Sequence, residues 1–455
     1  METDNKQTRF YDVHCHAMNL SHPNLLTFVQ RILRGLKKRL ILIIVCSIFI
    51  LSMVLYGFKK WTATPLELSI AIAAIALLIA IAALPQALRI FNLLAIMEND
   101  TGNIFILLEN CLMDQESKSR AVLEQNRLII GDTEFDTIVL TPLVMDFGKK
   151  MKAPWHLRTF YYKKPIQKAV KVQTVDLFNG IKFYTQAHAK NSSRPLFEIY
   201  PFLGITACNY SSGEIEAMLN KYFCGYTGKR EDLFKKMGAF DGDIDAMDSN
   251  FFAGIKVYPP LGFDPWPDDA AKRAKMECIY KFCGEKKIPI TSHCSDGGFR
   301  ILDDKRDLLF TSPRRWESVL ENYPSLKLDL AHMGKQERCK KEQGETWEDT
   351  VFRLIACYDN VYTDFACCAF KFADYDSILK SINIQSKKLK KILDRKNYKL
   401  EDKVLFGSDF MINLIWTDSY NRYLKTFRDY KGGGPDMARW KLKFCQENPE
   451  RFLFG

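Results

Sequence analysis

Two histidines separated by one residue, His14 and His16, follow a short stretch near the start of the chain, Arg9–Val13. Alternate side chains of a β-strand point to the same side, so a strand that ends in His-x-His places both imidazoles together. Two neutral imidazoles placed in this way can bind one transition-metal ion. The spacing therefore predicts a metal site at the end of a first strand, to which later parts of the chain would add ligands.

Four more residues with suitable chemistry stand at or near the ends of apolar stretches. They are Lys256 in GIKVYPPLG, His293 in PITSHCSDGG, His332 in LDLAHMG and Asp409 in VLFGSDF. Each has an ordinary structural explanation when taken alone, such as a capping or snorkelling side chain. A fold that brought the ends of these stretches together would collect four of the seven histidines, a lysine and a carboxylate into one site.

The sequence that must position these residues alternates strand-like and helical stretches, which indicates parallel βα units. The clearest helix is predicted over Asp268–Lys287, and the long region Tyr210–Asn250 is expected to form helices that cap the site. Eight strands are expected, which predicts a (β/α)₈ TIM barrel with its active site at the carboxyl ends of the strands. The predicted strands are Arg9–His14, Thr137–Met145, Leu196–Leu203, Phe252–Val257, Pro289–His293, Leu326–His332, Val361–Phe365 and Lys403–Asp409.

Two long uncharged stretches, Leu40–Phe58 and Leu68–Leu88, interrupt this pattern after the first strand. Each is close to the ~20 residues that a helix needs to cross a bilayer. They predict an inserted two-helix transmembrane hairpin. The basic, amphipathic stretch Pro23–Lys38 is expected to lie at the membrane surface before the first span. The expected organisation is a first strand in residues 1–22, the membrane segment in 23–98 and the remainder of the barrel in 99–455.

The distribution of basic residues predicts the orientation of this hairpin. Five arginines and lysines at positions 31–39 precede the first span, whereas the turn between the spans carries only Lys59 and Lys60. Because basic residues favour the cytoplasmic side, the N-terminus is expected in the cytoplasm. An even number of spans returns the chain to the same side. The predicted location is the inner (cytoplasmic) membrane, with both termini and the barrel in the cytoplasm.

The overall composition agrees with a folded protein beside an anionic surface. The chain of 455 residues is 47% hydrophobic and carries a net charge of +11. The charge is spread along the chain without a zinc-finger or Gly/Arg-rich pattern, which favours a membrane surface and disfavours nucleic acid as a partner. The 13 cysteines form no C-x-x-C pair and are expected to be reduced thiols.

On these motifs, the chain resembles the amidohydrolase superfamily of metal-dependent hydrolases with a (β/α)₈ barrel. It is most similar to the amidohydrolase-related branch, which also contains decarboxylases and lactonases. The resemblance covers nearly everything outside the hairpin, including the closing NPERFLFG of Asn448–Gly455.

The resemblance implies roles for the candidate residues. His14, His16 and Asp409 would hold a first metal, while His293 and His332 would hold a second or divide between binding a metal and polarising the substrate. Lys256 matches the position at which some members carry a carbamylated lysine that bridges two metals. The implied cofactor is one or two divalent ions, with zinc the preferred choice for imidazole and carboxylate ligands.

The implied reaction is hydrolysis of a C–N or C–O bond in an amide, cyclic amide, lactone or ester. A metal lowers the pKa of bound water, Asp409 transfers the proton as base and then acid, and His332 or a second metal polarises the carbonyl. The alternatives are a single-metal decarboxylase or lactonase of the same superfamily, and a non-catalytic membrane scaffold.

Three further residues are weaker candidates for the surroundings of the site. Asp364, at the end of the seventh predicted strand, either orients a ligand or lies at the surface, and Tyr258 and Arg194 are candidates for contact with the substrate. The expected substrate is a small molecule. Because the hairpin follows the first strand, it is expected on the active-site face of the barrel. Either the substrate is amphiphilic and taken from the bilayer, or the hairpin only tethers the enzyme or binds a membrane-protein partner.

Overall fold

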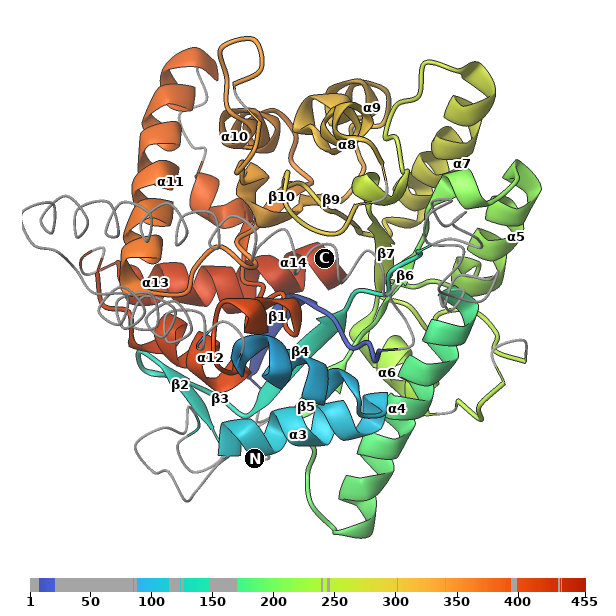
Figure 1. Ribbon diagram of the computed structural model, residues 1–455, viewed down its shortest axis with the longest axis vertical. Helices are drawn as coiled ribbons and strands as arrows, with labels where there is room; N and C mark the ends of the chain where they lie inside the picture. The colour runs from blue at the N-terminus through green and yellow to red at the C-terminus, as the bar shows by residue number, and fades with distance from the viewer. Residues whose placement is uncertain are drawn as a thin grey trace, which may run out of the picture.

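The fold is described from a computed structural model (Figure 1). The described residues are 8–20, 85, 88–113, 123, 127–147, 170–238, 240–243, 246–300, 302–339, 341–393, 399–432, 434 and 436–455. The two predicted spans, apart from Pro85 and Leu88, and the predicted surface helix Pro23–Lys38 lie outside these residues. Among the helices that are described, none combines the length and the apolar character that crossing a bilayer requires. The hairpin and the division of the chain at residues 22 and 98 therefore stay predictions.

The strands form a closed ring of parallel neighbours, in agreement with the predicted barrel. The register runs from β1 through β4 to β5, and from β6 through β7, β8, β9 and β10 to β11. Parallel bridges Leu143–Phe202 and Cys15–Phe410 join the two sheets and close the ring. The strands are β1 (Arg9–Cys15), β4 (Thr137–Pro142), β5 (Phe197–Ile199), β6 (Phe202–Gly204), β7 (Gly254–Val257), β8 (Ile290–Ser292), β9 (Leu328–Leu330), β10 (Val361–Asp364) and β11 (Val404–Leu405).

Each of the eight predicted strands has a counterpart in the ring, but the boundaries differ. The third one, Leu196–Leu203, is divided into β5 and β6 at Pro201, which lacks the N–H group that a continuous ladder requires. The last one ends at Leu405, well before the predicted end at Asp409. His332 and Asp409 have φ values of 66° and 57°, so the chain leaves the extended conformation before it reaches them. His332 and Asp409 thus lie just beyond the ends of their strands.

Helices surround the ring of strands (Figure 1). The predicted helix Asp268–Lys287 is confirmed as α7 (Ala270–Lys286), which begins where the Asp269 side chain accepts a hydrogen bond from Lys272 N–H. The other helices are α3 (Thr101–Met113), α4 (Val170–Lys190), α5 (Ser212–Phe223), α6 (Arg230–Gly238), α8 (Asp304–Thr311), α9 (Glu317–Asn322), α10 (Trp347–Cys357), α11 (Phe372–Leu393), α12 (Tyr420–Asp429), α13 (Met437–Leu442) and α14 (Asn448–Phe454). A small antiparallel pair, β2 (Leu128–Ile130) and β3 (Thr133–Phe135), precedes β4.

The expectation that the region Tyr210–Asn250 caps the site is wrong for α6. Arg230 in this helix donates a hydrogen bond of 2.6 Å to Glu450 of α14. Helix α14 lies at the amino-terminal end of the strands, where Phe452 contacts Tyr362 with 5.2 Å between ring centroids. This end of the barrel is opposite the metal-ligand candidates. Sequence periodicity predicts that a segment is helical, but it does not tell which end of a barrel the helix covers.

The tightness of packing in the ring can be tested at Gly254, the first residue of β7. A Cβ atom at Gly254 would lie 2.5 Å from the Phe202 ring and 2.6 Å from the Pro289 carbonyl oxygen. Gly254→Ala is therefore expected to lower the free energy of unfolding by about 1–3 kcal/mol, because the backbone must shift. Gly213→Ala is the control, since no heavy atom lies within 4 Å of the added Cβ. Denaturant titrations of the three proteins measure the difference, and equal stability of Gly254→Ala and the wild type would contradict the tight packing.

Candidate metal centre

Four histidines from three different strands meet at the carboxyl end of the barrel. His14 and His16 come from the end of β1 and its continuation. His293 directly follows β8, and His332 lies two residues beyond the end of β9. The ring centroid of His14 lies 5.6 Å from that of His16 and 4.8 Å from that of His332, which is 4.8 Å from that of His293. All four side chains are buried. The barrel therefore brings together residues separated by more than 300 positions in the sequence.

Outer hydrogen bonds orient the two imidazoles of β1. His14 Nδ1 lies 2.6 Å from Asp364 Oδ2, and His16 Nδ1 lies 2.9 Å from the Leu143 carbonyl oxygen. Both partners are acceptors, so each Nδ1 carries the proton and each Nε2 keeps a free lone pair. The two Nε2 atoms face the Asp409 carboxylate, at 3.7 Å from His14 and 3.2 Å from His16. One potential ligand atom from each of these three residues lies within 4.8 Å of the others.

The other two imidazoles point lone pairs at each other. His332 Nδ1 donates to the Ala366 carbonyl oxygen at 2.8 Å, which leaves Nε2 as an acceptor. His293 Nε2 donates to the Ser295 carbonyl oxygen at 2.9 Å, which leaves Nδ1 as an acceptor. These two acceptor nitrogens are only 3.1 Å apart. Two facing lone pairs repel unless a proton or a cation lies between or beside them, so the pair has the arrangement of ligands to a positive charge.

The protonation states favour metal binding. Burial lowers the pKa of His14 to about 4, despite the raising influence of Asp364, and burial also lowers the pKa values of His293 and His332. Burial alone would raise the pKa of Asp409, but the His16 ring beside its carboxylate and the nearby His14 and His332 rings lower it. Near neutral pH, these three imidazoles are uncharged donors and the carboxylate is an anion, which are the forms that bind divalent ions.

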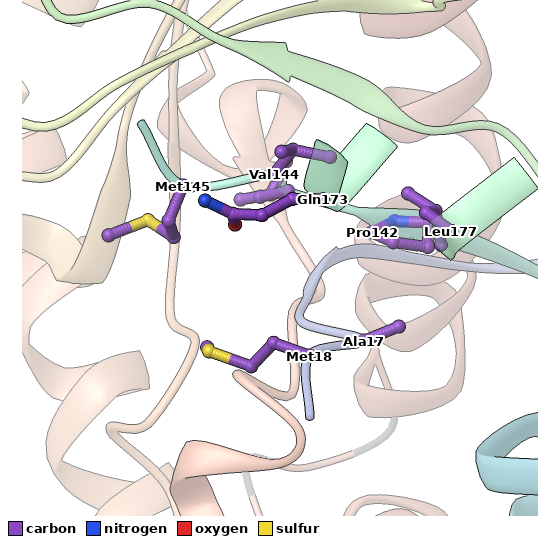
Figure 2. A pocket seen from close by; sticks show the side chains of 8 residues that line it. Ala17, Met18, Pro142, Val144, Met145, Gln173 and Leu177 are labelled. Atoms are coloured by element: carbon purple, nitrogen blue, oxygen red, sulfur yellow. The ribbon is translucent and has the colours of Figure 1, made fainter. Parts of the chain in front are cut away.

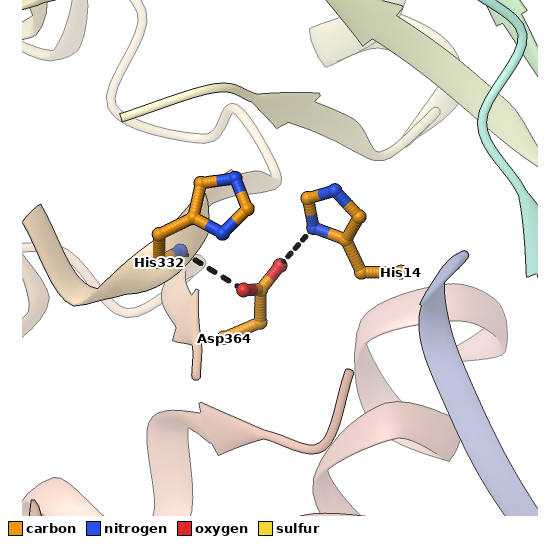
Figure 3. A group of neighbouring side chains, drawn as sticks. All are labelled: His14, His332 and Asp364. Atoms are coloured by element: carbon orange, nitrogen blue, oxygen red, sulfur yellow. Dashed lines mark hydrogen bonds and ion pairs between the residues drawn. The ribbon is translucent and has the colours of Figure 1, made fainter. Parts of the chain in front are cut away.

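Asp364 does not lie at the surface, which was one of the two positions that the sequence allowed. It is fully buried, and its Oδ1 accepts hydrogen bonds from the backbone N–H groups of His332 at 2.9 Å and Ala366 at 3.0 Å. Its Oδ2 binds His14, so one carboxylate connects two of the histidines (Figure 3). Burial would raise the pKa of Asp364, but His14 and the His332 N–H group lower it. A carboxylate in this position fixes both the tautomer and the ring plane of a ligand.

Lys256 lies deeper in the barrel than the histidines, nearer the amino-terminal ends of the strands. It pairs with Thr291, two residues before His293, and Thr291 pairs with Asp329, three residues before His332. All three side chains are buried, and Lys256 Nζ, Thr291 Oγ1 and both Asp329 oxygens have no hydrogen-bond partner among the described residues. Burial lowers the pKa of Lys256 to about 8 and raises that of Asp329 well above its usual value. Among the described residues, the layer below the site is therefore a buried polar set whose members interact through their charges.

The two remaining sequence candidates lie in different places. Tyr258 is level with His293, and the two rings stack with centroids 4.3 Å apart, while Phe299 N–H donates to the tyrosine hydroxyl at 3.0 Å. Arg194 is not brought to the site. It precedes β5 and donates to Thr137 at the start of β4, so it lies at the amino-terminal end of the strands. Residues before a parallel strand and residues after it occupy opposite ends of a barrel.

Asp296 and Asp329 belong to the surroundings of the site and were not predicted. The Asp296 carboxylate accepts hydrogen bonds from the backbone N–H groups of Glu337, Arg338 and Cys339, at 2.6, 2.5 and 2.7 Å. It thereby joins the loop after His293 to the loop after His332. The sequence signal for Asp329 was available, because a carboxylate inside the apolar strand of LDLAH is unusual. No comparable signal marks Asp296, whose partners are backbone groups of a distant loop.

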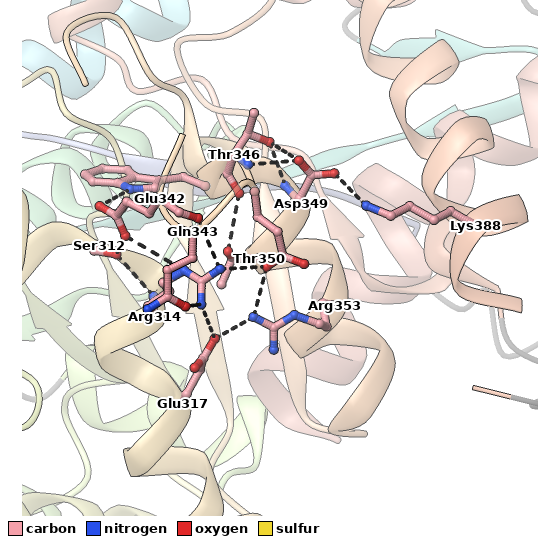
Figure 4. Close-up of polar contacts among 12 residues, drawn as sticks. Ser312, Arg314, Glu317, Glu342, Gln343, Thr346, Asp349, Thr350, Arg353 and Lys388 are labelled. Carbon is pink, nitrogen blue, oxygen red and sulfur yellow. Dashed lines mark hydrogen bonds and ion pairs between the residues drawn. The ribbon is translucent and has the colours of Figure 1, made fainter. Parts of the chain in front are cut away.

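A network of ion pairs holds the far part of the loop after His332 (Figure 4). Arg314 Nη2 lies 3.0 Å from Glu345, and Arg353 Nη2 lies 3.3 Å from the same carboxylate. Glu342 accepts hydrogen bonds from Ser312 at 2.7 Å and from the Trp347 indole at 2.9 Å. The loop is thus fastened at both ends, by Asp296 near the histidines and by this network near α10.

These observations test whether a divalent metal fits the residues. The donor set consists of imidazoles, each oriented by an outer hydrogen bond, and the Asp409 carboxylate. The potential ligand atoms of His14, His16 and Asp409 converge at one place. Imidazole and carboxylate groups with such outer partners are typical ligands of zinc, manganese and iron. The residues therefore fit a divalent metal held by His14, His16 and Asp409, with His293 and His332 beside it.

Comparison with known proteins finds a family match in the carboxyl-terminal part of the chain. Residues 236–455 match the family model described as Amidohydrolase. This segment contains Lys256, His293, His332 and Asp409, whereas the His-x-His motif lies before it. The match confirms the expectation of a metal-dependent, hydrolase-like enzyme, and the parallel α/β ring fits the TIM barrel that the resemblance implied. No curated protein matches the sequence.

Several solved structures are similar to the chain at low identity. A 4-oxalomesaconate hydratase from Rhodopseudomonas palustris aligns at 12% identity with a TM-score of 0.42, over 98% of this chain and 95% of that one. A 5-carboxyvanillate decarboxylase from Novosphingobium aromaticivorans, solved with bound manganese, aligns at 12% identity with a TM-score of 0.40, over 98% of this chain and 97% of that one. At these values the likenesses carry no argument about the activity of this chain.

The orienting role of Asp364 can be measured through metal affinity. Asp364→Asn keeps the size of the side chain but removes the anion beside His14, so the affinity for zinc or manganese is expected to fall by about 10–100-fold. Competition with a chelating dye measures this affinity. Asp436→Asn, at an exposed position before α13, is the matched control and is expected to leave the affinity unchanged. An unchanged affinity in Asp364→Asn would show that Asp364 does not orient a ligand.

Proposed function

We propose that the protein is a metal-dependent hydrolase of the amidohydrolase type that cleaves a C–N or C–O bond. The observation that supports this proposal most directly is the convergence of free imidazole lone pairs on the Asp409 carboxylate, each fixed by a hydrogen bond on the opposite side of its ring. Such a centre is suited to activating water and polarising a carbonyl group. Amides, cyclic amides, lactones and esters all present such a carbonyl.

The residues have distinct roles in this proposal. When bound, a divalent metal supplies Lewis acidity and lowers the pKa of a nearby water molecule. Asp409, held as an anion, accepts the proton of the attacking water and returns it to the leaving group. His332 carries its proton on the nitrogen that binds the Ala366 carbonyl oxygen, so its inward nitrogen is available to bind a metal or, once protonated, to polarise the substrate. Zinc is our preferred metal for this donor set.

A single-metal decarboxylase or lactonase is the second candidate, and the position of Lys256 favours it. The lysine is level with Thr291, two residues before His293, and with Asp329, three residues before His332. It is therefore not level with the histidines. A carbamate on Lys256 would add an anion close to Asp329, Asp364 and Asp409, all of which interact with this lysine electrostatically. A two-metal centre bridged by carbamylated Lys256 would have to compensate for this repulsion with the charge of the second ion.

Metal content distinguishes these candidates. Elemental analysis of the purified full-length chain is expected to show about two zinc ions for a bridged hydrolase centre and about one for the single-metal branch. A variant with His14→Ala and His16→Ala is expected to lose the metal, because two ligands of the first ion are removed. His188→Ala is the matched control, since this histidine binds Glu109 on the outer helices at 2.8 Å. Absence of metal after addition of zinc or manganese would contradict the proposal of a metal-dependent enzyme and favour a non-catalytic membrane scaffold.

We also propose that the chain is anchored in the inner membrane by the hairpin Leu40–Phe58 and Leu68–Leu88, with the barrel in the cytoplasm. The uncharged lengths of these stretches and the basic residues before them support the anchor. The helical stretch 88–97 follows the second span directly. Within it, Arg89 donates to Asp418 at 2.9 Å and Asn92 donates to the Asp418 carbonyl oxygen at 3.0 Å.

This attachment supports an orientation of the barrel. Asp418 lies in the connection between β11 and α12. This connection begins at the carboxyl end of the strands. The chain that emerges from the hairpin therefore reaches the barrel on the side of the metal centre. A mouth that faces the bilayer would receive amphiphilic substrates, or would be open to a membrane-protein partner.

Membrane fractionation tests the anchor. The full-length chain is expected in the membrane fraction after carbonate washing, because two apolar spans hold it there irrespective of charge. A variant that lacks Leu40–Leu88 is expected to leave the membrane fraction while it retains its metal. Release of the full-length chain by carbonate or high salt would contradict the hairpin and indicate surface binding instead.

A further inference from the structure

Asp12, two residues before His14, is a buried carboxylate that accepts hydrogen bonds from distant parts of the chain. Its Oδ1 accepts from Ser408 N–H at 2.9 Å and from His14 N–H at 3.4 Å. Its Oδ2 accepts from the Ser408 hydroxyl at 2.5 Å and from the Tyr420 hydroxyl at 3.0 Å. An ionised carboxylate offers about four acceptor positions, so these donors use all of them. Asp12 thus joins β1 to the residue directly before Asp409.

An irregularity of β1 separates Asp12 from the histidines. The register between β1 and β4 shifts between Asp12 and Cys15. Before the shift, the chain contacts helix α12 outside the ring, where the ring centroid of Phe10 lies 6.2 Å from that of Phe427. Beyond Asp12, the His14 side chain turns to the metal centre. In a regular strand Asp12 and His14 would point to the same side, and shifts of this kind redirect a side chain. The Asp12 carboxylate therefore reaches the centre through the backbone.

Asp409 requires support because its backbone is left-handed. Its φ of 57° lies in a region that residues with a side chain rarely adopt. Asp409 N–H donates to the His14 carbonyl oxygen at 2.7 Å, and Phe410 N–H donates to the Ser408 hydroxyl at 3.0 Å. The same hydroxyl donates to Asp12, so Ser408 connects Asp12 to the residues on both sides of the strained position. In this conformation the Asp409 carboxylate faces both imidazoles of β1.

The end of β1 is a fixed partner for this segment, because β4 packs against its other side. Leu143 N–H donates to the Cys15 carbonyl oxygen at 2.8 Å. Figure 2 shows Met18, which follows the second histidine by two positions, across a small space from Met145. The space has a volume of about 10 Å³, which is room for about one water molecule. The position of Asp409 relative to β1 therefore depends on the segment after β11, which is the segment that Asp12 holds.

We propose that Asp12 is a positioning residue of the metal centre. Through Ser408 it holds the left-handed backbone of Asp409, so that this carboxylate faces His14 and His16. The inference rests on the proposed function, since it assigns how a ligand of the first metal is held. The alternative is that Asp12 only ties β1 to the chain after β11 and contributes to stability, which predicts no effect on metal binding.

The zinc affinity of the full-length chain, measured by competition with a chelating dye, tests this role. Asp12→Asn replaces an acceptor oxygen with a donor, so the affinity is expected to fall by about 10–100-fold. Ser408→Ala removes the connecting hydroxyl and is expected to have a similar effect, which also serves if Asp12→Asn does not fold. Tyr420→Phe is the matched control. It removes one hydrogen bond from the same carboxylate but leaves Ser408 in place, so the free energy of unfolding is expected to decrease while the zinc affinity stays unchanged.

A thermodynamic cycle with Asp409→Asn shows whether Asp12 acts through this ligand. In the Asp409→Asn background, Asp12→Asn is expected to cause no further loss of zinc affinity, because the ligand that it positions is already changed. An effect independent of Asp409 would instead be equal in both backgrounds. Asp12→Asn is also expected to change the visible absorption of the cobalt-loaded protein, which depends on the ligands and their geometry.

The outcomes separate this inference from the one on which it rests. A loss of affinity in Asp12→Asn or Ser408→Ala that is absent from Tyr420→Phe and from the Asp409→Asn background supports the positioning role. Unchanged affinity in both variants, an equal loss in Tyr420→Phe, or equal losses in both backgrounds overturns this role and leaves the metal-dependent hydrolase intact. A wild-type chain that binds no zinc contradicts both.

Discussion

The candidate centre depends on one constraint, which is that each imidazole has a hydrogen-bond acceptor on its outer side. Asp364 binds His14, the Leu143 carbonyl oxygen binds His16 and the Ala366 carbonyl oxygen binds His332. These acceptors hold the proton of each ring outward, so the free lone pairs point inward. Without them, each ring could rotate or exchange its tautomer, and a cluster of buried histidines would be no better than a polar defect in the core.

The outer acceptors are themselves products of the barrel. Leu143 follows β4, Asp364 ends β10 and Ala366 lies two residues beyond it, so the orienting groups come from strands other than those that carry the rings. Closure between β1 and the end of β11 brings Asp409 to the first two histidines, where its N–H group donates to the His14 carbonyl oxygen at 2.7 Å. The hydrogen bonds from Glu337–Cys339 to Asp296 then hold the two remaining histidine loops together.

The buried layer beneath the histidines bears on the number of metals. Lys256 and Asp329 have opposite charges available, yet each is fully buried and lacks a hydrogen-bond partner among the described residues. Such groups are stable inside a protein only when water, an ion or each other's charge compensates for the lost hydration. This layer makes the choice between one and two metals a matter of charge balance in the barrel interior.

Much of this arrangement was predictable from local sequence. The His-x-His motif requires only the two-residue periodicity of a strand. In LDLAHMG and VLFGSDF, a polar residue follows an apolar stretch, which indicates the end of a buried strand. Eight such strands alternating with helices predict a parallel barrel, and a parallel barrel must gather the carboxyl ends at one mouth. The ligand candidates His14, His16, His293, His332 and Asp409 could therefore be named before the structure was known.

Tertiary structure alone decided the rest, because it depends on contacts between distant segments. No periodicity distinguishes Asp364 as an orienting carboxylate from a surface residue, places Arg194 at the opposite end of the barrel, or links Asp296 to backbone groups some forty positions away. The register that sets Lys256 below the histidines, and the ring tautomers that direct their lone pairs inward, likewise follow from neighbouring strands. The sequence by itself determined which chemical groups are available and at which ends of the strands they stand. Their orientation and charge, and therefore their capacity to hold a metal, came from the packing of the closed barrel.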